Sequence, residues 1–518
     1  MNNSGQSGAP VLAILGGSVL MLYIAASVML SSGNTMGSMF YYMLIGGGVF
    51  GLLSPKKAFI LFMVQCACLD MAKRLMIVGG TVSRDDLYYV LGIAPVTVMG
   101  IAVGLVLRVF FGQVQAGKGD FFRLILAGML MAAGAVIGYR GGGGISAMMK
   151  TVADGYFYGI LIFVIPLLFP TAMDIQRLWK LILWLFIPVA IYGIYQQFYG
   201  FRDFEIDYLS TGLTIEIKQI DSGRIRAFSS LNAPTSLSLI CGELAAMALL
   251  LVALGRKDHR LGLRWFIGFA MAVIFIGGWI ASTVRVGILV VPVALVGYVL
   301  FRSPRWTLAF YILCALAFGS LIYAAPYILQ NVESWTMRIH EFTGNNEFMA
   351  NMLDANTYKD RLMGFVNVLG NPDAYSLFGI GEEQMHGDFY NHDPLSSALV
   401  KFGTVVLSAG LLFVIFAVRF LHQCAWQIRD PGARHLAVAC LAVAAGSVAV
   451  SMVGGNLIST FPGNAFLAMP IGMVIALRRS AQSAKAPASK DAALPQPSSW
   501  KGQRLPWQAA AGSSGQLR

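Results

Sequence analysis

Charged residues are scarce in this sequence. Only 12% of the 518 residues are Asp, Glu, Lys or Arg, whereas 57% are hydrophobic and the mean hydropathy is +0.68. A soluble domain typically carries about 25% charged residues, so the chain lacks the polar side chains that would cover a water-soluble globule. The composition therefore predicts a protein whose solvent is largely the lipid bilayer.

Several motifs with a defined chemistry are also missing. The sequence contains no GxxxxGK[ST] loop and no HExxH site, which excludes ATP hydrolysis and zinc chemistry by those routes. It has no Asp-x-Asp pair to hold a metal and a diphosphate, and Asp203-Phe204-Glu205 is a weak substitute. No nucleic-acid-binding motif accompanies the net charge of +12. We therefore expect no metal, no cofactor and no nucleic-acid partner.

Cysteine gives no sign of a disulfide framework, because all six cysteines lie in or beside apolar runs and none lies in a long polar segment. We interpret them as small hydrophobic side chains. The ten N-terminal residues contain no Lys or Arg, and the apolar run that follows is long enough to span a membrane. This pattern predicts a retained first helix rather than a cleaved signal peptide.

Long apolar runs dominate the rest of the chain. They predict an all-α polytopic membrane protein with about fourteen transmembrane helices. The predicted spans are 11–31, 36–53, 57–73, 88–110, 121–140, 154–170, 177–198, 233–254, 264–281, 285–302, 306–325, 394–420, 434–453 and 461–478.

Lys and Arg concentrate in every second connection between these spans. The bias predicts that the chain is a multi-pass inner-membrane protein with both termini in the cytoplasm. Two long polar segments, 199–232 and 326–393, then fall on the non-cytoplasmic side, and such long loops tend to be functional. The predicted organisation is helices 1–11 in residues 1–325, a large loop in 326–393, helices 12–14 in 394–478 and a disordered tail in 479–518. Short amphipathic helices are predicted within the large loop at 333–342 and 358–369.

Arginines on the outer side are the first candidate site residues. Arg224 and Arg226 end the first polar segment, and Arg285 stands in the short turn Ser282-Thr283-Val284-Arg285-Val286-Gly287. Arginines at a membrane face can hold phosphate oxygens through paired hydrogen bonds. The alternatives are that they anchor helices at lipid headgroups or pair with carboxylates.

The end of the large loop supplies the second group of candidates. His392 can accept a proton from a hydroxyl near neutral pH, and Asp393 can orient it. The same residues also resemble a helix start, with Asn391 or Asp393 as the N-cap and Pro394 in the first helical position. Arg361, which leads a predicted amphipathic helix, is a further candidate for contact with phosphate, although a solvated helix face explains it as well.

Glu243 lies well inside a predicted span. An intramembrane carboxylate is a functional candidate by default, and it can equally serve as the partner of an arginine on another helix. Together with Asp154 it keeps open the alternative of an ion-coupled transporter, which would use charges near the middle of the membrane. A non-catalytic membrane assembly protein is the remaining alternative.

In the order of its motifs, the chain resembles the superfamily of bacterial O-antigen ligases and polysaccharide polymerases. The resemblance rests on Arg226 with Asn232-Ala233-Pro234, on the turn around Arg285, on Asp360-Arg361 and Phe378-Gly379-Ile380-Gly381, and on Asn391-His392 with Lys401-Phe402-Gly403. Val284 replaces the usual Ser, Asp393 often stands as Asn in the family, and Lys401 replaces a commoner acidic residue.

This resemblance implies an inverting, metal-independent glycosyltransferase. The donor would be a glycan on polyprenyl (undecaprenyl) diphosphate, and the acceptor a hydroxyl of another glycan or of a lipid-linked glycan. Arg285 and His392 would be catalytic, and Arg226, Arg224 and Arg361 would bind the diphosphate, with Asp393 and Glu243 in support. Membrane lipids and a chain-length regulator or flippase would be its partners.

Overall fold

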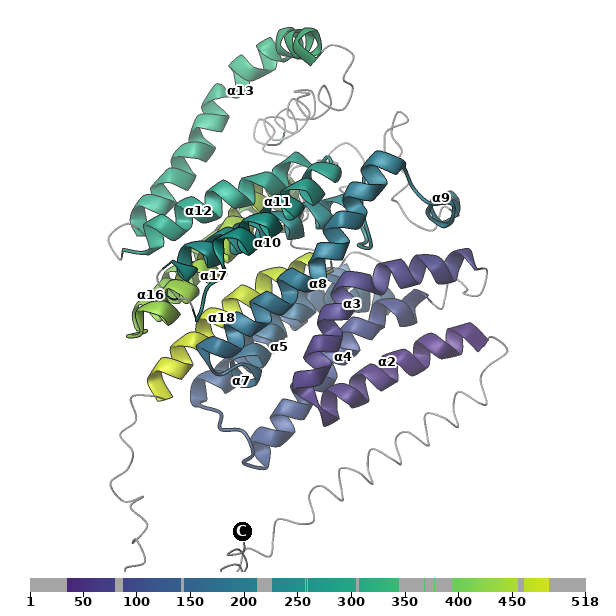
Figure 1. Cartoon of the computed structure of the whole chain (residues 1–518), viewed down its shortest axis with the longest axis vertical. Helices are drawn as coiled ribbons and strands as arrows, with labels where there is room; N and C mark the ends of the chain where they lie inside the picture. The colour runs from purple at the N-terminus through teal and green to yellow at the C-terminus, as the bar shows by residue number, and fades with distance from the viewer. Residues whose placement is uncertain are drawn as a thin grey trace, which may run out of the picture.

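The described part of the chain is helical throughout. The computed structural model describes residues 35–79, 87–140, 144–211, 226–256, 258, 260–303, 307–343, 368, 377, 394–454 and 461–483. Every regular element in these ranges is a helix (Figure 1). All the predicted spans after the first fall in these helices, whereas 11–31 lies outside the described residues. The predicted all-α class is confirmed.

The helices follow one another with short connections. The first part of the chain contains α2 (Thr35–Leu53), α3 (Pro55–Val78), α4 (Leu87–Phe110), α5 (Lys118–Arg140), α6 (Gly144–Thr151), η1 (Val152–Tyr156), η2 (Phe157–Ile160), α7 (Leu161–Leu168), α8 (Ala172–Tyr199) and α9 (Asp203–Ser210). The second part contains α10 (Pro234–Gly255), α11 (Trp265–Ala281), η4 (Arg285–Leu289), α12 (Val290–Phe301), α13 (Thr307–Thr343), α16 (Pro394–Trp426), α17 (Pro431–Gly454) and α18 (Gly463–Ser483).

Among the described residues, six helices are long and apolar enough to cross a membrane: α4, α5, α8, α10, α16 from Gly403 onward, and α17. Shorter apolar stretches lie in α2, in the run from η2 through α7, in α11 and in the run from η4 through α12. The protein is therefore membrane-embedded, and the number of fourteen spans stays a prediction.

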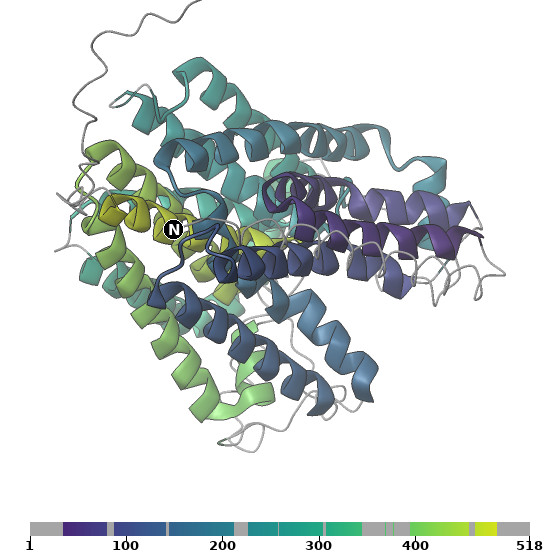
Figure 2. The ribbon, with the colours of Figure 1, turned by 90° about the horizontal axis from the view of Figure 1, so that it is seen from below.

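Burial separates central helices from peripheral ones. In the most apolar windows of α10 and α17, 83% and 78% of the residues are buried, against 17% in α5 and 11% in α16. α10 and α17 therefore form the centre of the bundle, while α5 and α16 expose apolar side chains at its edge. Figure 2 shows the N-terminal helices, in purple, on one side and α16 to α18, in green and yellow, on the other.

The connections gather at two ends of the bundle. One end, here called the basic end, holds the Lys- and Arg-rich connections tied together by polar contacts. These contacts are Lys56–Asp174, Arg108–Leu53 O, Arg479–Asp120, Gln176–Gly262 O and Trp426–Phe301 O. The opposite end, here called the site end, carries α9, the segment 226–233 and the turn 282–284. The alternation of basic connections predicted from the sequence is thus present within this bundle, and the membrane side that each end faces stays a prediction.

α13 differs from the sequence prediction. A span ending at residue 325, a loop from 326 to 393 and a separate short helix at 333–342 were predicted. One 37-residue helix instead continues from the span through the start of the predicted loop to the end of the short helix. At 1.5 Å per residue it is ~55 Å long, which exceeds the ~30 Å hydrocarbon core of a bilayer. Pro326, where the loop was predicted to begin, lies within this helix. A proline removes one backbone hydrogen bond and crowds the carbonyl four residues earlier, but a long membrane helix can continue past it. Figure 1 shows α13 rising away from the other helices.

Small residues bring α2 and α4 into backbone contact. A Cβ atom on Gly100 would lie 2.1 Å from the carbonyl oxygen of Gly48, and one on Gly104 would lie 2.6 Å from that of Leu52. Both helices carry the Gly-x-x-x-Gly spacing that lets membrane helices approach closely, at Gly47–Gly51 and at Gly100–Gly104. These glycines therefore hold α2 in the bundle.

We expect Gly100→Leu to destabilise the protein, because the new side chain meets the backbone of α2, which cannot move aside. Overpacking of this kind costs about 1–3 kcal/mol or more. Gly128→Leu is the matched control, since Gly128 lies in α5 with nothing within 4 Å of its Cβ direction. Thermal unfolding of the purified variants in detergent measures the difference. Equal melting temperatures for the two variants would refute the close α2–α4 contact.

Candidate functional site

Two of the predicted arginine motifs meet at the site end. The backbone N–H of Ala227 donates a hydrogen bond to the carbonyl oxygen of Ala281, the last residue of α11, at 3.3 Å. Arg226 is therefore one residue from this bond, and Arg285 follows Ala281 by four residues. Four residues of chain span at most ~14 Å. Segments more than fifty residues apart in the sequence thus bring Arg226 and the Arg285 position into one region.

α10 fixes the turn that carries Arg285. A Cβ atom on Gly242 would lie 2.3 Å from the carbonyl oxygen of Gly287, and one on Gly287 would lie 2.0 Å from the hydroxyl oxygen of Ser238. α10 and η4 therefore touch backbone to backbone, which only glycine permits at both positions. The Ser238 hydroxyl also donates to the carbonyl oxygen of Val284 at 2.8 Å.

The turn itself is tightly hydrogen-bonded and strained. Trp279 Nε1 donates to Val284 O at 2.8 Å, and the Val284 N–H donates to Ser282 Oγ at 3.2 Å. Thr283 has a φ of 53°, in the left-handed region that non-glycine residues rarely adopt. Its hydroxyl oxygen is shielded from solvent and has no hydrogen-bond partner among the described residues. Such strain is retained where the surroundings impose it, and it clusters at functional sites.

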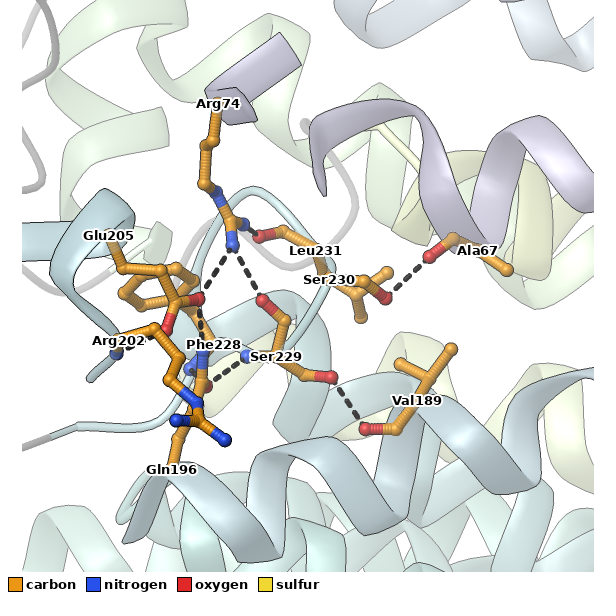
Figure 3. A network of polar contacts seen from close by, with 10 residues as sticks. All are labelled: Ala67, Arg74, Val189, Gln196, Arg202, Glu205, Phe228, Ser229, Ser230 and Leu231. Carbon is orange, nitrogen blue, oxygen red and sulfur yellow. Dashed lines mark hydrogen bonds and ion pairs between the residues drawn. The ribbon is translucent and has the colours of Figure 1, made fainter. Parts of the chain in front are cut away.

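A buried arginine supports the other motif. Arg74, at the end of α3, is 1% exposed, and its guanidinium donates to the carbonyl oxygens of Ser229, at 2.6 Å, and of Leu231 (Figure 3). The same group lies 4.1 Å from the centre of the Phe228 ring and 3.6 Å from a carboxylate oxygen of Glu205. Arg74 therefore clamps the segment that follows Arg226.

Gln196 on α8 completes this network. Its amide oxygen accepts hydrogen bonds from the N–H groups of Phe228, at 3.2 Å, and of Ser229, at 2.6 Å, while its amide nitrogen donates to Glu205 at 2.6 Å (Figure 3). Ser229 has a φ of 57°, a second left-handed non-glycine residue at this end of the bundle. Its hydroxyl donates to Val189 O at 2.5 Å, and the Ser230 hydroxyl donates to Ala67 O at 2.5 Å. The segment is thus bound on both sides to α3 and α8.

Glu205 is a structural residue rather than a metal ligand. Burial raises the pKa of its carboxyl above the usual range, and the Arg202 N–H and the Arg74 charge act in the opposite direction. Its carboxylate accepts from the Arg202 N–H at 3.1 Å, which caps the start of α9. The Asp203-Phe204-Glu205 sequence therefore does not present two carboxylates to a ligand.

The structure describes only some of the predicted site residues. Arg226 is exposed, and Arg285 opens η4. Arg224, Arg361, His392 and Asp393 lie outside the described residues.

α16 follows His392 and Asp393 directly in the sequence. The helix begins at Pro394, as predicted, and its backbone breaks at Gly403, where φ is 78°. The span from Gly403 to Trp426 runs to the basic end, so Gly403 lies toward the site end. Lys401-Phe402-Gly403, one of the motifs behind the family resemblance, thus coincides with this break.

Glu243 stands apart from the arginines. It is 1% exposed in the middle of α10, and both carboxyl oxygens lack a hydrogen-bond partner among the described residues. Ser447 of the neighbouring α17 interacts with this carboxyl. Glu243 follows Gly242, the residue in contact with η4, and so lies beside the scaffold of the turn rather than in it.

Sequence reasoning missed Arg74 and Gln196. The available signal was the pair Lys73-Arg74 at the outer end of an apolar span, where basic residues run against the overall bias. Gln196 gave no signal of its own, since a single amide at the end of a helix has many ordinary explanations.

No group of three or more His, Cys, Asp or Glu side chains in the described ranges is arranged to hold a metal ion. Comparisons of the chain with known protein families, with curated proteins and with solved structures give no match.

We expect Arg74→Met to release the segment after Arg226, because Glu205 is left buried without its cation and two backbone carbonyls lose their donor. Breaking a buried pair in this way costs about 3 kcal/mol or more. Hydrogen exchange of the peptide that contains Phe228 and Ser229 should rise, with peptides from α17 unchanged. Arg202→Gln, which removes an exposed arginine at the same end, is the control. Unchanged exchange in Arg74→Met would contradict the clamp.

Proposed function

We propose that the protein is a metal-independent, inverting glycosyltransferase that acts at the site end of the bundle, on the non-cytoplasmic side of a bacterial inner membrane. It would polymerise or ligate glycans from a polyprenyl-diphosphate donor onto a hydroxyl of a glycan or lipid-linked acceptor. This is the activity that the resemblance to O-antigen ligases and polymerases implies. A chain-length regulator or flippase would act with it.

One observation carries the proposal: the hydrogen bond from Ala227 to Ala281 that joins the Arg226 segment to the turn with Arg285. If Arg226 and Arg285 only anchored helices at lipid headgroups, their two segments would need neither contact with each other nor rigid support. Here Arg226 precedes the strained Ser229, which Gln196 and Arg74 bind, and Arg285 follows the strained Thr283. The carbonyl oxygen of Val284, next to Thr283, accepts hydrogen bonds from Ser238 and Trp279. Fixed donors aimed at a developing charge are the basis of electrostatic catalysis.

The chemistry of the donor fits two arginines. The acceptor oxygen attacks the anomeric carbon while the bond from that carbon to the diphosphate oxygen breaks, so the anomeric configuration inverts. The departing diphosphate gains negative charge, which Arg226 and Arg285 would stabilise through paired hydrogen bonds. His392 would take the proton of the acceptor hydroxyl, with Asp393 orienting the ring. Arg224 and Arg361 would add contacts to the diphosphate.

We expect Arg226→Ala and Arg285→Ala each to lower glycan transfer by roughly a hundredfold to a thousandfold, the usual effect of removing one donor to a developing anion. His392→Ala should lower transfer by roughly a hundredfold or more. Transfer is measured in reconstituted membranes from a polyprenyl-diphosphate-linked glycan with no added metal.

Arg202→Ala is the matched control, because Arg202 is an exposed arginine at the same end with its guanidinium over the Tyr195 ring. Membrane abundance is checked by immunoblot for every variant. Transfer close to that of the unmodified protein in all three test variants would exclude this site.

Glu243 favours a second candidate function, ion-coupled transport, because a buried carboxyl inside a membrane bundle is a common site of proton exchange. This alternative leaves the supported arginine segments without a role. The two functions predict opposite results for one substitution.

We expect Glu243→Gln to retain glycan transfer to within a few-fold, because Gln keeps the size of the side chain and the carboxyl lies outside the arginine region. Ser451→Ala, which removes another buried polar group without a partner on α17, is the control. Transfer and proton movement into dye-loaded vesicles are followed in the same preparation. Proton movement in the unmodified protein that Glu243→Gln abolishes, without any glycan transfer, would support the transporter instead.

A further inference from the structure

A cleft lies at the basic end of the bundle, away from the proposed glycosyl-transfer site. Two adjoining cavities of about 650 and 660 Å³ lie where α10 ends and α11 begins, with α8 on one side. They share Gly255, Leu263, Arg264 and Ile267. We call the pair the Arg264 cleft. Its size is within the range of small-ligand sites, about 300–1,000 Å³.

Close backbone packing builds the cleft. A Cβ atom on Gly262 would lie 2.1 Å from the Cα of Gly255, and the Leu263 N–H donates to Leu251 O at 3.0 Å. The connection between α10 and α11 is thus folded back against the end of α10. As a result Arg264 stands at a fixed position between the two cavities.

The cleft combines apolar walls with cations that lack counter-charges. Val252, Trp265 and Phe266 line one cavity together with Arg256, and Lys180 and Trp184 line the other. Among the described residues, Lys180, Arg256 and Arg264 form no ion pair, whereas Lys56, Arg123 and Arg479 at the same end do. Unpaired cations that converge on an apolar cleft predict an anionic ligand with an apolar part.

The start of α11 adds to the positive field. Arg264 is its N-cap and makes no side-chain capping bond, and the first hydrogen bond that closes the helix runs from Gly268 N–H to Arg264 O. The preceding N–H groups, at residues 265–267, have no intrahelical acceptor, and these three residues line the cleft. Such groups attract phosphate, and here they lie beside two guanidinium groups.

Exposed tryptophans indicate the depth of the cleft. Trp184 is 59% exposed and Trp265 is 68% exposed, and both line it. Trp gathers where the hydrocarbon of a membrane meets its headgroups, and Lys and Arg gather on the cytoplasmic side. The cleft thus has the composition of a headgroup-level site. A soluble anion would gain nothing from the apolar walls and the tryptophans.

We propose that the Arg264 cleft binds an anionic phospholipid from the leaflet at the basic end. Arg264, Arg256, Lys180 and the first N–H groups of α11 hold the phosphate headgroup, and the acyl chains lie along the apolar walls. Basic pockets between membrane helices recognise anionic headgroups in this way. This site is independent of the proposed glycosyl transfer and lies at the other end of the bundle.

The test uses the full-length protein, stripped of lipid in detergent and titrated with dioleoyl phosphatidylglycerol or dioleoyl phosphatidylcholine under native mass spectrometry. We expect a discrete bound phosphatidylglycerol and weaker phosphatidylcholine. In the triple variant Lys180→Gln, Arg256→Gln, Arg264→Gln the affinity for phosphatidylglycerol should fall roughly tenfold or more. A photoactivatable phosphatidylglycerol should label peptides that contain residues 180–184 and 264–267.

The matched control removes the same charge at the same end but outside the cleft, through Lys57→Gln, Arg177→Gln and Arg429→Gln. All the substituted residues in both triple variants are at least partly exposed, so both should fold, as checked by size-exclusion chromatography and circular dichroism. Equal affinities for the two lipids, an equal loss in the control, or labelling spread over other helices would overturn the site. Displacement by millimolar inorganic phosphate would identify a small-anion site and overturn the lipid assignment.

Discussion

The guanidinium of Arg74 is the contact on which the site end depends. It is buried where a charge is costly, so its ion pair with Glu205 and its two backbone acceptors must form together. These partners belong to two other parts of the chain, and satisfying the arginine therefore brings α3, α9 and the segment 226–233 into one arrangement. The position of Arg226 beside α11 therefore depends on the buried charge of Arg74.

The helical architecture was largely predictable from the sequence, because each membrane span must satisfy its backbone hydrogen bonds internally and therefore appears as a long apolar run. The basic connections could be assigned to one end by the same kind of reasoning. The exception is α13, whose full length was not predicted. Hydropathy reports which residues avoid water, but a helix that continues past the apolar run changes composition without changing conformation, so its length could not be read from the pattern.

The candidate site was predictable in part. Arg226 and Arg285 were recognised as unusual because their connections were predicted on the side with few basic residues, and the structure brings their segments together. The contact itself could not be foreseen, since it depends on a backbone bond between distant segments and on glycines whose role appears only when α10 meets η4. Arg74 was missed although the pair Lys73-Arg74 was a signal, because its acceptors in the segment 226–233 are backbone carbonyls that no residue pattern marks. Gln196 was missed because a single amide gives no signal. His392 and Asp393 remain predictions from the sequence.

The long sequence separation in the Arg74 network has a consequence for biogenesis. Arg74 and its acceptor Ser229 are 155 residues apart, so the arginine leaves the ribosome well before any of its partners. At roughly 5–20 residues per second, the interval is roughly 8–30 s. During that time the end of α3 has to remain among hydrated headgroups, where its charge is tolerated. The Arg74 side chain can become buried only after α8, α9 and the residues before α10 have been synthesised. The rate of translation, rather than the hydrophobicity of the helices, therefore sets when the assembly of this half of the protein is completed.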